Sequence, residues 1–355
     1  MTVSHMPISK FSPPVPERRS AADGLAFKLY LLFMVSWFLH LPERAPVLAL
    51  FRLDLVLVVI VAVLIGAGRG SDVEHFDSRI KRLILLLIAY AIITVPFVQW
   101  PGTVVKSGLP ELLKALVFYY FTARLTTSER RLSQLLFVFV SCQAFRVLEP
   151  LYLHVTQGYW GSVAYMEGGK FLDRLSGAPS DVVNPNGLAV VILCIIPFVH
   201  YLWTRTRVGA LAYLVLLSLL LYALVLTGSR SGLLGLATTF LALWLQSRRK
   251  LLLATVAAVV VVTVVPRLPP DLVDRYASIF DSDTKNAATA EGRLEGAKAD
   301  FAVAMRRPLL GHGLGTTTEA NFHFNGYAQP SHNLYLEVLE ELGFVGLLIF
   351  VLLLG

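Results

Sequence analysis

Long apolar runs alternate with short charged connections along most of the chain, and this alternation is its dominant pattern. A run of roughly 17 to 25 apolar residues is long enough to cross a lipid bilayer as a helix. We expect such spans at residues 25–41, 47–67, 83–99, 110–124, 132–153, 186–203, 208–226, 231–247 and 250–266. The pattern therefore predicts a bundle of nine membrane helices joined by polar connections.

The composition agrees with a membrane protein and narrows the alternatives. Hydrophobic residues make up 55% of the chain and charged residues only 15%, whereas a soluble domain carries about 25% charged residues. The net charge of +7 does not form one basic face, because the cations cluster at the ends of apolar runs, so no nucleic-acid partner is expected. Cys142 and Cys194 both lie inside apolar runs and predict neither a disulfide framework nor a thiolate metal site.

Positive charges mark alternate connections and so predict the orientation. They gather ahead of the first run and after runs two, four, six and eight. Because cytoplasmic connections carry an excess of lysine and arginine, these segments are predicted to be cytoplasmic. Residues 1–24 are polar and proline-rich and predict a disordered tail on the same side.

The longer polar segments then fall on the outer face. Residues 25–265 are the predicted bundle, with an outer loop at 154–185, and residues 266–332 are a large outer loop. Residues 333–355 begin with three carboxylates and end in an apolar stretch too short for a span. We expect an interfacial helix there, followed by the start of a tenth span that the sequence truncates.

Three residues near the outer face are candidates for the chemistry. Arg230, in the tight connection TGSRSG, either snorkels at the interface or binds a phosphate beside helix ends. Arg293, in EGRLEG, has a spacing that is equally typical of a solvated helix face. His332 is either a surface residue of a helix capped by Ser331 or Asn333, or an imidazole that exchanges a proton with a hydroxyl or contacts a phosphate.

Two further residues are expected beside this site. Arg174 lies in DRLSGAPSDVVNPNGLA of the first outer loop, and His312 lies in GHGLG, a turn that lets the backbone approach a ligand. The spacing of His312, His323 and His332 matches no zinc pattern, and no HExxH sequence is present, so no catalytic metal is expected.

Arg146 and Glu149 form a pair of opposite charges near the outer end of the fifth run. They are three residues apart and can therefore pair on one helix face. The pair serves either as scaffolding or as the lining of a polar cavity, and scaffolding is the favoured interpretation.

Three sequence motifs, taken in order, resemble those of one bacterial superfamily. They are TGSRSG, then EGRLEG followed by RRPLLGHGLGT, then PSHNLYLEVLEELGFVGLLIF. With these motifs the chain resembles the O-antigen ligase and Wzy-type polymerase superfamily, and DRLSG…NPNGLA also looks like a segment of that family. The resemblance covers residues 170–355, whereas the first five spans match only in hydropathy.

The resemblance implies an all-α integral membrane enzyme with a fold related to the GT-C glycosyltransferases, with about ten transmembrane helices and a large extracytoplasmic loop. Such enzymes transfer a glycan from an undecaprenyl-diphosphate-linked donor to a hydroxyl of a lipid or glycan acceptor, without a cofactor. The reaction takes place at the periplasmic face of the inner membrane, among membrane lipids. Ligase and polymerase both stay open, and a transporter or permease, or a non-catalytic component of a polysaccharide export complex, are the rival functions.

The resemblance also implies roles for individual residues. Arg230 and Arg293 would hold the diphosphate, and His332 would contact a phosphate or act as base toward the acceptor hydroxyl. Together with Arg230 and Arg293, the expected substrate-binding residues are Arg174, His312 and Asn333.

Overall fold

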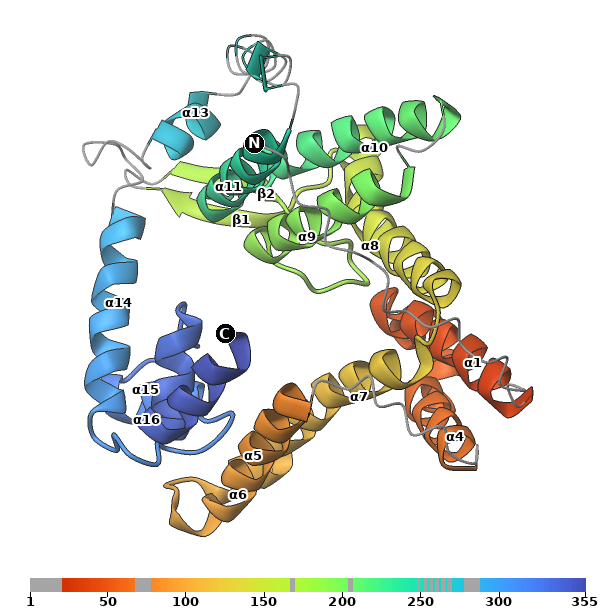
Figure 1. Ribbon diagram of the computed structural model, residues 1–355. Helices are drawn as coiled ribbons and strands as arrows, with labels where there is room; N and C mark the ends of the chain where they lie inside the picture. Colours follow the sequence, from red (N-terminus) through yellow and green to blue (C-terminus); the bar gives the residue numbers. More distant parts are fainter. Residues whose placement is uncertain are drawn as a thin grey trace, which may run out of the picture.

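The computed structural model describes residues 21–67, 78–166, 170–203, 207–247, 270–277 and 288–355, with isolated residues between 250 and 266. Helices dominate this part of the chain (Figure 1). The helices are α1 (Ala21–Phe38), α2 (Leu41–Arg44), α3 (Pro46–Leu50), α4 (Leu53–Ala67), α5 (Ser78–Ile93), α6 (Pro101–Thr103), α7 (Leu109–Leu125), α8 (Glu129–Gln157), α9 (Pro185–Trp203), α10 (Arg207–Leu226), α11 (Arg230–Gln246), α13 (Pro270–Ala277), α14 (Ala288–Ala304), α15 (Thr317–Asn325) and α16 (Leu334–Leu354). A 3-10 turn, η1 (Val95–Phe97), and a π-helical turn, η2 (Val104–Gly108), precede α7.

The predicted apolar runs coincide with helices wherever the structure describes them. The runs from 25–41 to 231–247 overlap α1, α4, α5, α7, α8, α9, α10 and α11 in turn. The run at 250–266 lies largely outside the described residues. In the described ranges, Ala21–Phe38 and Glu129–Gln157 are long and apolar enough to cross a membrane, and Leu53–Ala67, Pro185–Val199 and Leu211–Leu226 are shorter apolar helices. The helical class is thus confirmed, and the number of spans stays a prediction.

The segment 154–185 departs from the all-helical prediction because it contains a β-hairpin. Strand β1 (Gly161–Met166) pairs antiparallel with β2 (Lys170–Leu175), with Gly161 opposite Leu175. Along β2, Phe171 is exposed whereas Leu172 and Arg174 are buried. An exposed aromatic residue and a buried arginine hide the apolar-polar alternation that would have predicted a strand.

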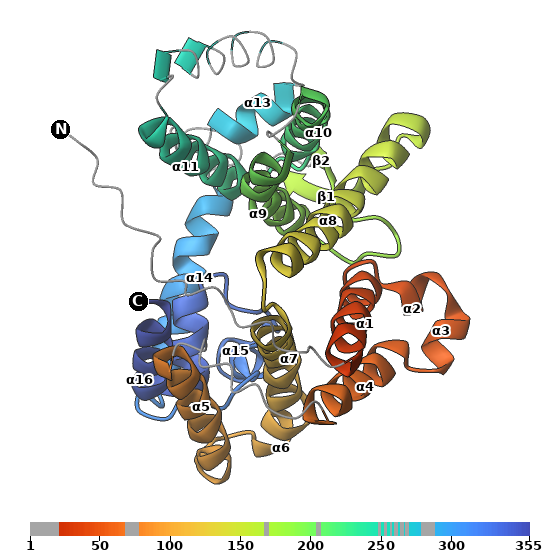
Figure 2. The ribbon, with the colours of Figure 1, turned by 45° about the vertical axis from the view of Figure 1, so that its right-hand side comes forward.

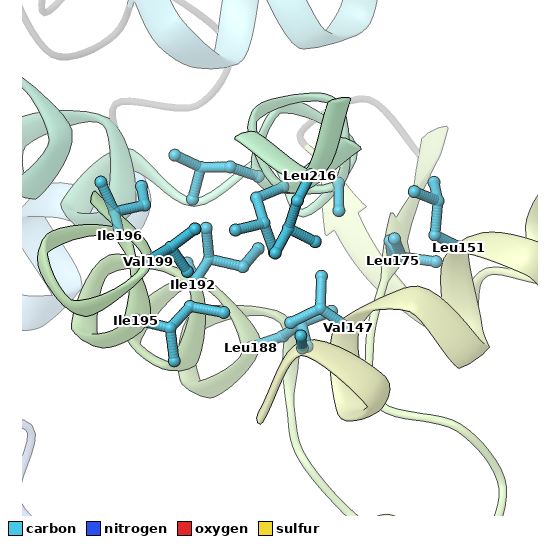
Figure 3. Close-up of a cluster of buried hydrophobic side chains, with 14 of the residues drawn as sticks. Val147, Leu151, Leu175, Leu188, Ile192, Ile195, Ile196, Val199 and Leu216 are labelled. Carbon is cyan, nitrogen blue, oxygen red and sulfur yellow. The ribbon is translucent and has the colours of Figure 1, made fainter. Parts of the chain in front are cut away.

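Two apolar clusters hold the helices together. One joins α1, α4, α7 and α8 through side chains such as Tyr30, Phe33, Val61 and Leu125. The other joins α8, α9 and α10, and Figure 3 shows part of it, with Val147 of α8 facing the α9 side chains. The labelled members of this second cluster are Val147, Leu151, Leu175, Leu188, Ile192, Ile195, Ile196, Val199 and Leu216. Helix α11 packs on α9 beside this cluster.

Helix α14 connects two parts of the molecule. In both views it runs from the neighbourhood of α13 and the hairpin to α15 and α16 (Figures 1 and 2). Its second half packs against α15 and α16, and α16 in turn packs on α5.

Helix α16 has two parts separated by Gly343, whose φ is 66°. The first part carries the three carboxylates that we expected at a membrane interface. Glu340 is instead fully buried and Glu341 is 9% exposed. Glu341 Oε1 accepts a hydrogen bond of 2.8 Å from Thr317 Oγ1 at the start of α15. Neighbouring elements thus cover Glu340 and Glu341, and the position of this helix at a membrane interface stays a prediction.

The GHGLG turn packs against the backbone of α16. The backbone N–H of His312 donates to the carbonyl of Glu340, and that of Gly313 donates to the carbonyl of Glu341, both at 2.9 Å. A Cβ atom on Gly311 would lie 2.3 Å from the carbonyl of Glu341. The glycines therefore allow close approach to a helix backbone, whereas an approach of this turn to a ligand stays a prediction.

The predicted pair between Arg146 and Glu149 is also wrong. Arg146 binds both carboxylate oxygens of Asp181 through one edge of its guanidinium group, with Nε–Oδ2 at 2.5 Å and Nη2–Oδ1 at 2.8 Å. Glu149 binds Arg44 instead, with contacts of 2.7 and 2.5 Å. Two-pronged contacts with partners from other elements replace the single contact that a spacing of three residues allows.

Candidate functional site: an arginine cluster beside a polar pocket

The connection between α10 and α11 is a tight turn with a defined cap. Gly228 has a φ of 56°, a left-handed conformation that glycine adopts without steric cost. Ser229 Oγ accepts a hydrogen bond of 3.1 Å from the N–H of Gly232 and so caps α11. Arg230 is the first residue of α11 and is 9% exposed. The turn therefore holds an arginine at the positive end of a helix.

Two more arginines bind this turn. Arg174 of β2 donates through Nε to the carbonyl of Thr227 at 2.7 Å and through Nη2 to Oδ1 of Asn186 at 2.9 Å. Arg275 of α13 donates through Nε to the carbonyl of Gly228 at 2.6 Å. Both side chains are buried. The two carbonyl groups that follow the end of α10 thus receive hydrogen bonds from two elements that are far apart in sequence.

The charges of four arginines influence one another here. The pKa of Arg174 is lowered to about 10, first by burial and then by the charge of Arg275, with further lowering by Arg293 and Arg230 and an opposite effect of Tyr276. Burial also lowers the pKa of Arg275, followed by the charges of Arg230 and Arg293. The pKa of Arg230 is lowered by burial and then by Arg293. Clustered positive charges with reduced access to water favour an anion.

A polar pocket lies along α14 and is lined by residues of three segments. Its volume is about 220 Å³. Its lining consists of Gly292, Arg293, Gly296, Ala297, Asp300, Asn321, Tyr327, Gln329, Pro330, His332 and Asn333. The α14 members recur at helical spacing and so share one face. Gly292, Gly296 and Ala297 are small, which leaves space between this face and the segment before α16.

Hydrogen bonds fix the far wall of the pocket. Asn321 Nδ2 donates to Asp300 Oδ1 at 3.1 Å and to the carbonyl of Gln329 at 3.0 Å. His332 is exposed, and its Nε2 lies 3.2 Å from Nε2 of Gln329. Asn333 caps α16, because its Oδ1 accepts hydrogen bonds from the N–H groups of Tyr335 at 3.0 Å and Leu336 at 3.4 Å. The imidazole of His332 therefore borders a pocket in which the side chains of Asp300, Asn321 and Asn333 are held by hydrogen bonds.

Arg293 belongs to both parts of the site. It lines the pocket with His332 and Asn333, and its charge lowers the pKa of Arg174 and of Arg230. The structure thus brings Arg174, Arg230 and Arg293 together at one end, and Arg293, His332 and Asn333 at the other. Arg230 does not line the pocket itself.

His312 lies apart from these candidates. Its side chain is fully buried, with Nδ1 3.0 Å from Oε1 of Gln99 and Nε2 3.0 Å from the carbonyl of Val303. Burial lowers its pKa, and the nearby positive charges of Arg307 and Arg306 lower it further. This position does not fit the expected substrate contact, because both ring nitrogens face protein atoms. Over the described ranges, no group of three or more His, Cys, Asp or Glu side chains could hold a metal ion.

Sequence reasoning missed Arg275 and its neighbour Tyr276. Leu272, Arg275 and Tyr276 are spaced as one face of a short helix, and Leu272 and Arg275 are both buried. That spacing could have singled out Arg275 as an arginine on a packed face. Tyr276 donates through its hydroxyl to the carbonyl of Val225 at 3.0 Å, so α13 binds the end of α10 twice.

Comparison with known proteins finds one family that part of the chain matches. Residues 215–351 match the family described as O-Antigen ligase. The matched segment contains Arg230, Arg275, Arg293 and every residue that lines the pocket, whereas Arg174 lies before it. Searches of curated proteins and of solved structures returned no match.

Proposed function

We propose that the chain transfers a glycan from undecaprenyl diphosphate to an acceptor hydroxyl, and the match of residues 215–351 to the O-Antigen ligase family supports this proposal. Glycan transfer of the ligase or polymerase type in a bacterial membrane is what the family supports. The diphosphate donor, the residues that act on it and the periplasmic face are our proposal. The observation that carries it is the position of Arg293, which lines the His332 pocket and whose charge lowers the pKa of Arg230.

The arginine cluster is suited to the diphosphate. Guanidinium groups bind phosphate oxygens in a two-pronged geometry, and a helix N-terminus such as that of α11 adds a favourable field. When the glycosidic bond breaks, negative charge builds on the diphosphate oxygen. Arg230 and Arg293 would stabilise that charge, an effect worth on the order of 3 kcal/mol per group.

The pocket is suited to the sugar and the acceptor. Its Asn321, Tyr327 and Gln329 combine amide groups with an aromatic ring, which suits a polyhydroxylated ligand. In the proposed step, the acceptor oxygen forms a bond to the anomeric carbon of the donor sugar. Its proton passes to His332, and the electron pair of the broken bond remains on the diphosphate. Every atom and charge is thereby accounted for without a further reactant.

The expected location follows from the same site. The N-terminus is proposed to be cytoplasmic, and the α10–α11 turn and the pocket are proposed to face the periplasm. Apolar helices on the described chain are compatible with a multi-pass protein of the inner membrane. A transporter would instead need its polar groups near the middle of the bilayer, on broken helices.

The first prediction tests this function in membranes. Purified protein in liposomes receives a lipid-linked donor and an acceptor on the same face, and product formation is followed. Arg230→Gln, Arg293→Gln and His332→Ala should each lower the rate by about 100-fold or more, because each would remove a group that acts in the transition state.

A matched control is Lys114→Gln, since Lys114 is an exposed cation that pairs with Glu111 on α7. This variant should transfer at the normal rate. Normal transfer by all three site variants, or no transfer by the wild-type protein with donors of this class, would contradict the proposal. A ligase should attach one preformed chain per acceptor, whereas a polymerase should produce a ladder of lengths.

A further inference from the structure

We propose that Arg275, together with Arg174, positions Arg230 for the reaction by fixing the α10–α11 turn from two sides. This inference rests on the proposed function, because it assigns how one of its residues is held. Arg275 is a positioning residue, since its Nε donates a hydrogen bond to the protein backbone.

The contact geometry is the first support. Arg174 and Arg275 donate through Nε to the carbonyls of Thr227 and Gly228, which are consecutive in the chain. The Nε–H bond of arginine points in a fixed direction within the guanidinium plane. Two such bonds from opposite elements restrict the rotation of both peptide groups. Arg230 follows only two residues later.

Tight packing around Gly228 is the second support. A Cβ atom on Gly228 would lie 3.2 Å from Leu272, 3.3 Å from Arg275 and 3.5 Å from Arg174. The two elements that supply the arginines also contact each other, because Leu172 of β2 and Leu272 of α13 form one buried apolar cluster. The hairpin and α13 therefore enclose the turn as one unit.

Electrostatics explains why two arginines can sit beside a third. The last carbonyls of a helix have no partner within the helix and carry partial negative charge. Thr227 and Gly228 follow the end of α10, so their carbonyls attract the two guanidinium groups. These carbonyl groups thereby offset part of the positive charge of Arg174 and Arg275. Arg230 and Arg293 then provide the remaining charge for an anionic ligand.

The consequence for the reaction is specific. If Arg275 acts through the turn, replacing Arg275 lowers the transfer rate only while Arg230 is present. If Arg275 binds substrate by itself, the fold-losses in rate from replacing Arg230 and from replacing Arg275 should multiply in the double variant. A double-mutant cycle separates these cases, because it measures the dependence of one residue on another.

The experiment measures transfer kinetics for Arg230→Gln, Arg275→Gln and the double variant in liposomes. We expect Arg275→Gln to lower kcat on the order of 10- to 100-fold, the effect of a misplaced catalytic group. In the Arg230→Gln background the same substitution should change kcat by less than about twofold. Losses that multiply, or normal transfer by Arg275→Gln, would overturn the positioning role.

Arg131→Gln is the matched control. Arg131 is also buried and donates through Nη1 to the carbonyl of Leu125, at the end of α7, at 2.9 Å. It therefore reproduces the local chemistry of Arg275 at another helix end. Any loss it causes should multiply with the loss from Arg230→Gln, as expected for an independent effect on folding.

Tyr276→Phe provides a milder test if Arg275→Gln unfolds. It removes only the hydrogen bond to Val225 and leaves the charge of Arg275 in place. We expect Tyr276→Phe to lower kcat less than Arg275→Gln does, and to leave kcat unchanged in the Arg230→Gln background. If the losses from Tyr276→Phe and Arg230→Gln multiply, the positioning role is overturned. Normal transfer by Arg230→Gln alone would overturn the positioning role, whereas normal transfer by Arg230→Gln, Arg293→Gln and His332→Ala alike would contradict the proposed function. If only the cycle fails, the proposed function stands without this positioning role.

Discussion

Glu340 is a carboxylic acid that the fold holds away from water. The side chain is fully buried, and neither oxygen has a hydrogen-bond partner within the described part of the chain. Burial first, and then the charges of Asp300, Glu341 and Glu337, raise its pKa from 4.5 to about 8. The folded protein thus keeps a proton that the unfolded chain releases at lower pH. Stability falls as pH rises from about 4.5 to 8 through this group.

Glu340→Gln should remove this pH dependence. Glutamine cannot ionise, so the variant should unfold at a higher temperature than wild type at pH 8, by an amount corresponding to a few kcal/mol, and the two should converge near pH 5. Thermal unfolding in detergent across this range measures the difference. The exposed Glu111→Gln is the control and should follow the wild-type profile. Equal pH profiles for Glu340→Gln and wild type would contradict the assignment.

At the scale of elements, the contact between the GHGLG turn and α16 depends on backbone proximity. Gly311 has a φ of 72°, and a Cβ atom there would lie 2.3 Å from both C and O of Glu341. Both the left-handed conformation and the contact oppose any side chain. The backbone of a helix cannot yield as a flexible side chain can.

Gly311→Ala should therefore destabilise the protein by at least about 1–2 kcal/mol, the cost of a left-handed residue with a Cβ. The control is Gly24→Ala in α1, where a Cβ atom meets nothing within 4 Å. That change should raise stability by about 0.5–1 kcal/mol, since alanine favours the helix. Unfolding temperatures measure both. A stable Gly311→Ala variant would mean that turn and helix do not approach as described.

The element scale also explains what sequence could predict. Apolar runs predicted the helices because the hydrogen bonds of a helix lie within one segment, and because the length of an apolar run can be compared directly with the thickness of a bilayer. The β-hairpin was missed because Phe171 is exposed and Arg174 buried, the reverse of the usual pattern. The partners of Arg146 and Glu149 were missed because Asp181 and Arg44 come from other elements. Spacing along one helix cannot reveal such partners.

In the candidate site too, local motifs were predictable from the sequence, whereas contacts between distant elements were not. Arg230, Arg293 and His332 were found through ordered motifs, and the structure brings Arg293 together with each of the other two. The contact of the GHGLG turn with α16 was not predicted, because a glycine-rich turn indicates close approach without identifying the neighbour. Arg275 escaped because its role depends on the carbonyl of Gly228, which is distant in sequence.

At the scale of the whole molecule, α14 joins the arginine cluster to the pocket. Its first half presents Arg293, and Asp300 in its second half is held by Asn321 of α15. An α-helix keeps a fixed angular relation between residues, at about 100° each. The angle between Arg293 and Asp300 therefore sets whether Arg293 faces the pocket and the cluster together.

Inserting two alanines after Gly296 should break this relation while keeping α14 helical. The insertion turns the first half of the helix by about 200° and moves it by about 3 Å relative to the second. Arg293 must then leave either the pocket or the arginine cluster, so transfer should fall as far as in Arg293→Gln. Unfolding should change less than activity, because the two apolar clusters contain no α14 residue.

A control insertion of two alanines after Phe51, in the exposed turn between α3 and α4, should leave transfer near the wild-type rate. Transfer assays and unfolding temperatures of the two insertions, measured side by side, separate the effect of helix phase from the effect of added chain. Near-normal transfer by the α14 insertion would mean that Arg293 need not face both parts of the site. The arginine cluster and the pocket would then work independently, and a single reaction centre spanning both would be excluded.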